Sequence, residues 1–297
     1  SFHQTDDYVA GLLTEEEKKS VPAGFETVPA KGLGKDSPYS FRMQVSPYDC
    51  LGCGVCLTAC PAEGALTMTS FEDMKTEQPL FDEVAMNETY LKKDVISDKS
   101  VKNIQFAKPY FQFSAACAGC AETSYARLVT QLFGDRMMIA NATGCTSIWG
   151  GSAPSMPYCK DAEGKGPAWA NSLFEDNAEF GLGMVMANKK VRSNLESRMN
   201  EAMDAVSPEL AAAFKEWIAA KDCAKGSKEA ADKIAALISD ADQSNPAIKE
   251  IADRTDYLVK RSQWVFGGDG WAYDIGYGGL DHVIASGEGI NIFVVDT

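Results

Sequence analysis

Apolar residues along the C-terminal two thirds of the chain follow helix and strand periods in turn. After Glu122 they recur every three or four positions, which predicts a helix over about 122–132. The apolar face of this helix carries Tyr125, Leu128, Val129 and Leu132. The next run, MMIAN at 137–141, predicts a buried strand that leads into the loop ATGC at 142–145.

Residues 262–297 follow the order strand, glycine turn, helix, glycine turn, strand. Such a βαβ unit implies a parallel sheet, in which ligands bind at the carboxyl ends of the strands. Between 184 and 260, apolar residues recur at helical spacing, and Ser207-Pro208 predicts the start of one helix. We interpret these helices as a structural insert without chemistry.

The remaining stretches show weaker patterns. Residues 1–40 are polar and rich in turn residues, and we expect a linker or an insertion there. Alternation in FRMQV at 41–45 predicts a short strand, with ALTM at 65–68 as its partner. Residues 71–110 are expected to form a connection. Residues 150–183, rich in glycine, proline and aromatic residues, are expected to form a long loop.

Length and composition are those of a globular protein, with 297 residues, 45% of them apolar and 24% charged. We place two domains, at 1–95 and 96–297. No apolar stretch approaches the ~18 residues that suggest a membrane span. The first residues lack the basic start and apolar core of a signal peptide. The net charge of −14 argues against nucleic acid and anionic membrane as partners.

Nine cysteines are many for this length, and most lie in clusters or beside glycine and proline. This favours metal ligation over disulfides, and we expect a reducing cytoplasm. The run C-x2-C-x2-C-x3-C followed by Pro61 is the bacterial iron–sulfur signature. Its cysteines are Cys50, Cys53, Cys56 and Cys60. Gly52 and Gly54 permit the positive φ values that such a loop needs. The alternative is a zinc site or reduced thiols.

A second set of cysteines comprises Cys117, Cys120 and Cys145. The helix and strand between Cys120 and Cys145 bring the two loops side by side, which suggests an incomplete four-iron site. A lone C-x-x-C is also typical of a thioredoxin-like redox pair or half a zinc ribbon. Cys159 and Cys223 are candidates for a fourth ligand, but we interpret each as a plain thiol.

The turn GGDG at 267–270 follows a predicted strand. A carboxylate at a strand end beside a helix N-terminus can hold a divalent cation against a diphosphate, and Asp269 is placed for this. Taken by itself, Gly-Asp-Gly is also ordinary turn chemistry.

These motifs together resemble one family. The iron–sulfur run is followed by CAGC at 117–120, ATGC at 142–145, GKGPAWANSLFEDNAEFG at 164–181 and GGDGWAYDIGYGG at 267–279. In this order they closely resemble the pyruvate:ferredoxin (flavodoxin) oxidoreductases over most of 41–297. The resemblance implies an α/β fold: a parallel-sheet thiamine diphosphate-binding domain with a helical insert, preceded by a ferredoxin-like α+β iron–sulfur segment.

The resemblance also implies roles for individual residues. Asp269 and Thr297 bind Mg²⁺. The ligands of the [4Fe-4S] cluster nearest thiamine are Cys117, Cys120 and Cys145. The ligands of the next cluster are Cys50, Cys53 and Cys56, and Cys60 reaches across to another. The residues expected to bind or line thiamine diphosphate are Glu122, Thr143, Cys145, Phe174, Gly268, Asp269, Gly270, Trp271 and Thr297.

The implied reaction is oxidative decarboxylation of pyruvate with coenzyme A to acetyl-CoA and CO₂, in a homodimer that passes electrons to ferredoxin or flavodoxin. We assign no catalytic residue to this segment: His3 lies in a polar terminus, and His282 is a surface or packing residue. The family places its remaining cluster ligands before Ser1 and beyond Thr297. We therefore expect an interior piece of a longer chain, inert in pyruvate-dependent dye reduction.

Two other functions stay open. One is a pure electron carrier, a ferredoxin-type module fused to a structural domain. The other is an oxidoreductase for a different 2-oxo acid, 2-oxoglutarate or an aromatic one, because the substrate is selected outside this segment.

Overall fold

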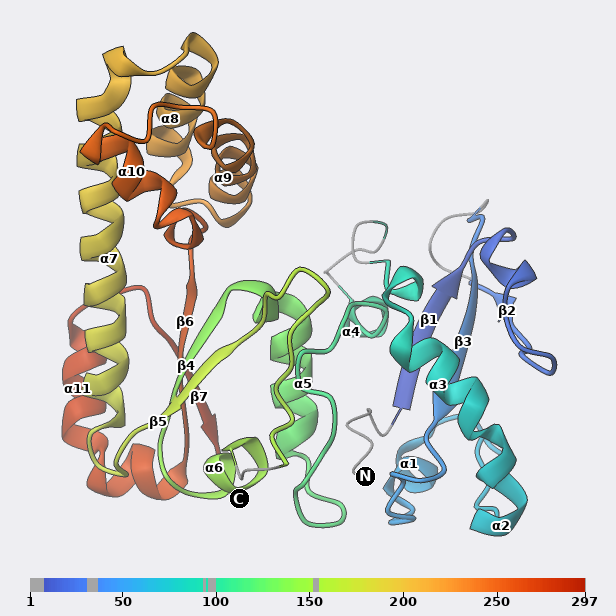
Figure 1. The fold of residues 1–297 in the computed structure, drawn as a ribbon. Coiled ribbons are helices and arrows are strands. Elements are labelled where there is room, and N and C mark those ends of the chain that lie inside the picture. The colour runs from blue at the N-terminus through green and yellow to red at the C-terminus, as the bar shows by residue number, and fades with distance from the viewer. Residues whose placement is uncertain (1–7, 31–36, 93–94, 96–99, 152–154, 297) are drawn as a thin grey trace. The chain divides into compact units, whose positions relative to one another are not determined.

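The computed structural model describes residues 8–30, 37–92, 95, 100–151 and 155–296. Figure 1 labels the helices and strands of the chain. Contacts divide the chain into two compact units, each made of two stretches of sequence. The first unit comprises Ser1–Asp135 and Cys145–Pro167, and the second comprises Arg136–Gly144 and Ala168–Thr297. No helix in the described ranges is both long and apolar enough to cross a membrane.

The first unit contains an antiparallel sheet in the order β1-β3-β2. β1 (Tyr8–Leu13) pairs along its whole length with β3 (Ser40–Val45), and β2 (Val28–Pro29) pairs with the other side of β3. The strand predicted at 41–45 is thus confirmed. The expectation of a linker over 1–40 is wrong, because both partners of β3 come from that stretch.

The expected strand at 65–68 is also wrong, because these residues form no strand. The expected connection over 71–110 instead contributes to the core: α3 (Gln78–Met86) packs on β1. Gly11 of β1 makes the close approach possible, since a Cβ there would lie 2.9 Å from Val84 Cγ1. The core beneath α3 contains Leu13, Phe25, Leu80, Phe81, Val84 and Tyr90.

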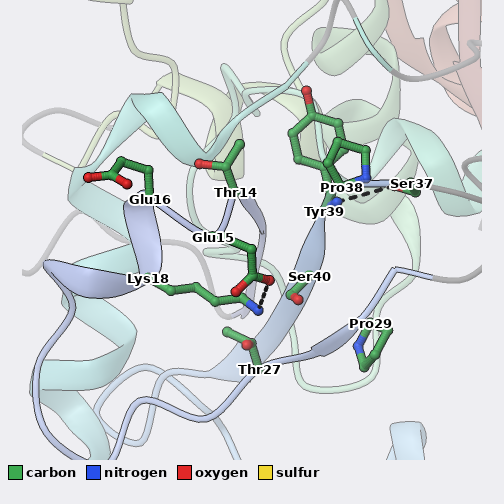
Figure 2. A pocket seen from close by; sticks show the side chains of 10 residues that line it. All are labelled: Thr14, Glu15, Glu16, Lys18, Thr27, Pro29, Ser37, Pro38, Tyr39 and Ser40. Atoms are coloured by element: carbon green, nitrogen blue, oxygen red, sulfur yellow. Dashed lines mark hydrogen bonds and ion pairs between the residues drawn. The ribbon is translucent and has the colours of Figure 1, made fainter.

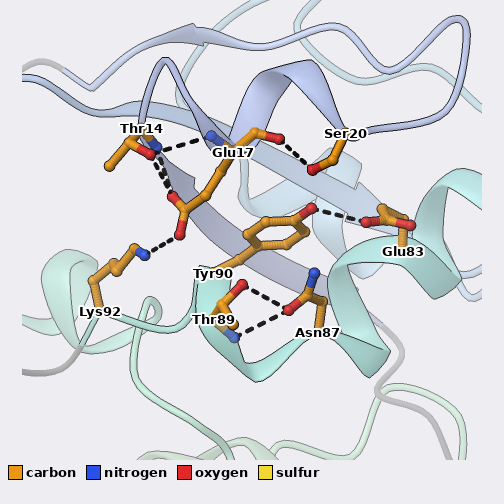
Figure 3. Close-up of polar contacts among 8 residues, drawn as sticks. All are labelled: Thr14, Glu17, Ser20, Glu83, Asn87, Thr89, Tyr90 and Lys92. Carbon is orange, nitrogen blue, oxygen red and sulfur yellow. Dashed lines mark hydrogen bonds and ion pairs between the residues drawn. The ribbon is translucent and has the colours of Figure 1, made fainter.

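Polar contacts tie the loop after β1 to the segment after α3 (Figure 3). The Thr14 main-chain N–H and hydroxyl donate to Glu17 Oε2 at 2.8 and 2.9 Å, and Lys92 forms an ion pair with Oε1 of the same carboxylate. The Tyr90 hydroxyl donates to Glu83 Oε1 at 2.8 Å. Of these bonds, the Lys92–Glu17 ion pair joins residues distant in sequence and so ties the end of β1 to the segment after α3.

The other elements of the first unit are short, apart from one helix. They are η1 (Glu17–Lys19), α1 (Val55–Ala59), α2 (Phe71–Met74), η2 (Lys75–Glu77), η3 (Glu88–Tyr90), α4 (Val101–Ile104), α5 (Glu122–Phe133) and α6 (Cys145–Gly151). α5 confirms the helix predicted from Glu122. The predicted apolar face is not the buried one, since Tyr125 is 58% exposed. The residues that α5 buries are Glu122, Thr123, Ala126, Arg127, Thr130 and Gln131.

The second unit contains a parallel sheet in the order β5-β4-β6-β7. Its strands are β4 (Met137–Asn141), β5 (Ala168–Asn171), β6 (Ser262–Gly268) and β7 (Asn291–Val295). β6 and β7 are joined through a π-helical turn, η8 (Gly270–Ile275), and α11 (Tyr277–Ala285). The α/β fold with a parallel sheet is therefore confirmed, as is the βαβ unit at the C-terminal end.

A bundle of helices connects β5 to β6. It consists of α7 (Asn177–Ala202), η6 (Met203–Ala205), α8 (Pro208–Ala220), α9 (Ala224–Ile238), α10 (Pro246–Ala252) and η7 (Thr255–Tyr257). Figure 1 shows α11 alongside the first half of α7, while α8–α10 gather around its second half. Ser207 caps α8 as predicted, since its side chain accepts from the Leu210 N–H. The helices have a core of their own, centred on Leu195, Phe214, Trp217 and Ile234.

The expected long loop over 150–183 is only partly correct. Residues 168–171 pair with β4 along the sheet edge, and α7 begins at Asn177. The glycines in this stretch concealed the helix. Gly181 is required by packing, because a Cβ there would lie 2.4 Å from Val265 Cγ2 of β6.

Candidate functional site

The iron–sulfur run forms an exposed loop after β3. Gly52 and Gly54 adopt φ values of +65° and +74°, which confirms the backbone conformation expected of them. Short helix α1 follows, and the Cys60 N–H donates to the Cys56 carbonyl at 3.0 Å. Cys60 Sγ lies 3.6 Å from the Ala62 carbonyl oxygen.

All nine cysteines fall within the described residues, and none is in a disulfide. Cys50, Cys53 and Cys56 are exposed, so their thiols are accessible to a metal centre. Within the described ranges, no group of three or more His, Cys, Asp or Glu side chains is arranged to hold a metal ion. The ligand sets remain predictions, which the donor chemistry and the loop conformation fit.

The second cysteine loop lies against the first within the same unit. The Cys120 N–H donates to the Cys117 carbonyl at 3.0 Å, with Gly119 at φ +79° between them. A Cβ on Gly119 would lie 3.5 Å from Val55 Cγ2, in the helix that carries Cys56. The two predicted cluster loops therefore lie next to each other, with the Gly119 main chain beside the Val55 side chain.

Cys145 is the first residue of α6, and a buried hydrogen bond ties this helix to α5. The Trp149 Nε1–H donates to Glu122 Oε2 at 2.6 Å. The indole also packs edge to face on Phe111, which makes a second edge-to-face contact with Tyr158. Glu122 is thus a buried carboxylate at the first turn of α5, two residues after Cys120.

The interpretation of Cys159 and Cys223 as plain thiols stays a prediction. Cys159 is half-buried with its Sγ 3.7 Å from the Pro109 carbonyl oxygen, and Cys223 caps the first turn of α9. His282 is exposed on α11. His3 and Thr297 lie outside the described residues.

The Gly-Asp-Gly turn lies at the carboxyl end of β6, in the second unit. Gly268 ends the strand, Asp269 follows half-buried, and Gly270 begins η8. A Cβ on Gly270 would lie 3.4 Å from Phe174 Cζ, so the structure brings these two predicted cofactor-lining residues together. A carboxylate at this edge, flanked by backbone without side chains, fits an Mg²⁺-bound diphosphate.

Trp271 differs from its neighbours because its side chain is fully buried. The indole lies between Gly267 and Gly276, where added Cβ atoms would come within 2.4 Å of it. Its Nε1–H has no hydrogen-bond partner among the described residues. Any contact that Trp271 makes with a bound group in this conformation therefore involves its main chain.

A network of small polar side chains joins the carboxyl ends of β5, β4 and β6. Its members are Asn141, Thr143, Asn171, Ser172 and Asn177. Asn141 and Asn177 are fully buried, and the Asn177 Nδ2–H donates to the Phe266 carbonyl at 2.9 Å. Of these five residues, only Thr143 was predicted from the sequence. The other residues could have been found from the polar side chains Asn141 and Asn171, which end β4 and β5. This pattern requires that β5 be recognised as a strand.

A pocket at the opposite end of the first unit's sheet contains none of the predicted site residues. It opens where β1 ends and β3 begins (Figure 2). It is lined by Thr14, Glu15, Glu16, Lys18, Thr27, Pro29, Ser37, Pro38, Tyr39 and Ser40. The cysteine loop follows the other end of β3, so this pocket is not part of the candidate site.

Comparison with known proteins extends these observations. No protein-family model matches the chain. The chain is 50% identical over 288 residues to the pyruvate-flavodoxin oxidoreductase of Klebsiella pneumoniae, covering 96% of this chain and 24% of that protein. It is 48% identical over 295 residues to that of Enterobacter agglomerans, covering 96% and 25%. It is 50% identical over 273 residues to the pyruvate:ferredoxin oxidoreductase of Moorella thermoacetica, covering 89% and 23%.

The chain is homologous to one segment of the pyruvate-flavodoxin and pyruvate:ferredoxin oxidoreductases. It spans about a quarter of the length of these relatives. The resemblance inferred from the motifs is thereby confirmed. The predicted cluster ligands and cofactor-binding residues fall in both units. Glu122 and all the predicted cysteine ligands belong to the first unit, and the Gly-Asp-Gly turn belongs to the second.

Proposed function

We propose that this segment serves an oxidoreductase that decarboxylates pyruvate with coenzyme A to acetyl-CoA and CO₂ and passes the electrons to flavodoxin or ferredoxin. The observation that carries the proposal is the coexistence, in one homologous segment, of two neighbouring cysteine loops and a Gly-Asp-Gly turn at a parallel-sheet edge. An electron carrier needs only the loops.

When bound, thiamine diphosphate supplies the electron sink for loss of CO₂, and [4Fe-4S] clusters supply one-electron transfer. In the proposal, Asp269 binds Mg²⁺ together with Thr297, and Gly268 and Gly270 let the main chain approach the diphosphate. Glu122, Thr143, Cys145, Phe174 and Trp271 line the cofactor.

The proposed cluster ligands follow the two loops. Cys117, Cys120 and Cys145 hold the cluster nearer the thiamine, and Cys50, Cys53 and Cys56 hold the next. Cys60 binds a further cluster. The proximity of Gly119 to Val55 supports electron transfer between the two proposed clusters, because the loops that would hold them lie next to each other. Thiolate-bound iron suits the reducing cytoplasm that we propose as the location.

The proposed assembly is a homodimer. Tyr277 and Ile284 on α11 are 58% and 61% exposed and are candidates for that interface.

The test uses the full-length protein that carries this segment, purified without oxygen and freed of thiamine diphosphate. We expect Mg²⁺-dependent binding of thiamine diphosphate in calorimetry, loss of that binding in Asp269→Asn, and unchanged iron content. Reduction of a low-potential dye should require pyruvate rather than 2-oxoglutarate. Iron–sulfur clusters without any thiamine diphosphate binding would identify an electron carrier instead.

A further inference from the structure

The hydrogen bonds between the ends of β4 and β5 have directions that the main chain fixes. The Asn141 Nδ2–H₂ group donates to the Ala142 carbonyl at 2.8 Å and to Asn171 Oδ1 at 3.0 Å. A carbonyl oxygen can only accept, so the Ala142 carbonyl determines which side of the Asn141 amide carries nitrogen. The Asn171 amide must then present its oxygen to Asn141.

The direction of the next bonds follows from this orientation. The Asn171 amide turns its nitrogen toward Thr143 and donates to Thr143 Oγ1 at 2.9 Å. The Thr143 hydroxyl in turn donates to the Ser172 carbonyl at 3.1 Å. A hydroxyl has one hydrogen and two lone pairs. At Thr143 the hydrogen and one lone pair are therefore occupied, and one lone pair is left to accept.

The surroundings hold this arrangement in place. Asn141 is fully buried, and its Oδ1 has no hydrogen-bond partner among the described residues, so rotation of the amide would place that oxygen against the Ala142 carbonyl. Ser172 is held by its N–H to the Asn141 carbonyl at 2.8 Å. The Thr143 side chain is exposed, so its remaining lone pair is accessible to a ligand.

We propose that Thr143 contacts the bound cofactor only as a hydrogen-bond acceptor, and that its partner is the amino group of the aminopyrimidine ring. This inference rests on the proposed thiamine diphosphate site. The diphosphate of thiamine diphosphate offers acceptor oxygens near neutral pH, and the aminopyrimidine is the part that carries N–H groups. Thr143 therefore recognises the ring and does not anchor the diphosphate. Asn171 is a positioning residue that acts through Thr143.

The experiment separates the two ends of the cofactor. Calorimetry on the full-length apoenzyme with Mg²⁺ measures the affinity for thiamine diphosphate and for inorganic diphosphate. We expect Thr143→Val to weaken thiamine diphosphate binding by about tenfold, the effect of losing roughly one hydrogen bond, and to leave inorganic diphosphate within about twofold. Thr143→Ser, which keeps the acceptor, should restore most of the affinity. Thr255→Val in η7 is the matched control and should change neither affinity.

Equal weakening of both ligands by Thr143→Val would place Thr143 on the diphosphate and overturn the proposal. No change in either affinity would remove Thr143 from the site and overturn it too. If the wild-type apoenzyme binds no thiamine diphosphate, it is the proposed function that fails.

The role of Asn171 is tested by a double-mutant cycle. Asn171→Leu should weaken thiamine diphosphate binding in the wild-type background and have no further effect in Thr143→Val, because its contribution passes through Thr143. Additive losses would show a merely structural role. Thermal unfolding of each variant identifies those that bind weakly because they fail to fold.

Discussion

Glu122 and Trp149 link the helices next to two predicted cluster loops. Glu122 lies two residues after Cys120, and Trp149 lies four residues after Cys145. Their buried hydrogen bond of 2.6 Å sets the position of α6 against α5. Hydrogen bonds to charged groups are stronger than those between neutral groups, so this bond should contribute more to the stability of the fold than a neutral hydrogen bond does.

Trp149→Phe should destabilise the chain by about 2–3 kcal/mol, because it leaves a buried carboxylate without its indole donor. Urea unfolding followed by circular dichroism measures the change. Trp264→Phe is the matched control, since the Trp264 indole donates to the neutral Ser262 hydroxyl. Its cost should be about 1 kcal/mol. Equal losses in the two variants would contradict a special role for the charged acceptor.

Glu17 should make the stability of the first unit depend on pH in the acid range. Burial raises the pKa of this carboxyl, but the hydrogen bonds from Lys92 and Thr14 outweigh burial and hold the pKa below its ordinary value of 4.5. A carboxyl with a lowered folded-state pKa stabilises the fold above its unfolded pKa. That stabilisation is lost as the pH falls through the folded pKa.

Glu17→Gln should therefore lower the free energy of unfolding at pH 7 by about 1–2 kcal/mol and flatten its decline below about pH 4.5. Unfolding curves between pH 3 and 7 provide the measurement. Glu16→Gln is the control, because Glu16 is exposed and forms a surface ion pair with Lys19. A Glu17→Gln curve parallel to the wild-type curve would contradict the assignment.

At the scale of elements, the packing of α7 on the parallel sheet depends on one glycine. Gly181 faces Val265 of β6, whereas a Cβ on Gly183, two residues along the helix, would meet nothing within 4 Å. The same substitution at these two sites therefore has opposite expected effects.

Gly181→Ala should destabilise the second unit by about 1–3 kcal/mol through overpacking, since the buried Val265 side chain cannot move away. Gly183→Ala should instead stabilise the helix by up to about 1 kcal/mol. Urea unfolding of both variants checks the pair. Stabilisation by Gly181→Ala would show that α7 does not pack as closely on the sheet as described.

At the scale of the whole molecule, the predicted cluster ligands and the Gly-Asp-Gly turn lie in separate units. Loss of a cluster ligand should therefore leave the diphosphate end of the cofactor site intact. In the full-length protein, Cys56→Ser should lower the iron content by about one cluster and leave the affinity for thiamine diphosphate within about twofold.

Iron analysis and calorimetry on the same preparation check this independence. Cys223→Ser, at the start of α9, is the control and should change neither quantity. Loss of thiamine diphosphate binding in Cys56→Ser would mean that the cluster loop and the cofactor site fold as one.

Local sequence was sufficient for much of the fold and of the candidate site. The period of apolar residues after Glu122 predicted that α5 exists but not which face it buries, and Gly52 and Gly54 predicted the conformation of the first cysteine loop. The order of strand, glycine turn and helix determined the βαβ unit that carries Asp269. These features depend on residues close together in the chain, so no partner distant in sequence is needed to infer them.

Tertiary structure decided what local sequence could not. β1 is a strand because β3 pairs with it, and β5 because β4 does. A glycine lies inside α7 at position 181 because Val265 of β6 occupies the space that a side chain would need. The Thr143 hydroxyl became an acceptor only when Asn171 and Ser172 were brought beside it. The sequence thus determined which chemical groups this protein has. Packing between distant residues decided which way they point, because the direction of a hydrogen bond depends on both of its ends.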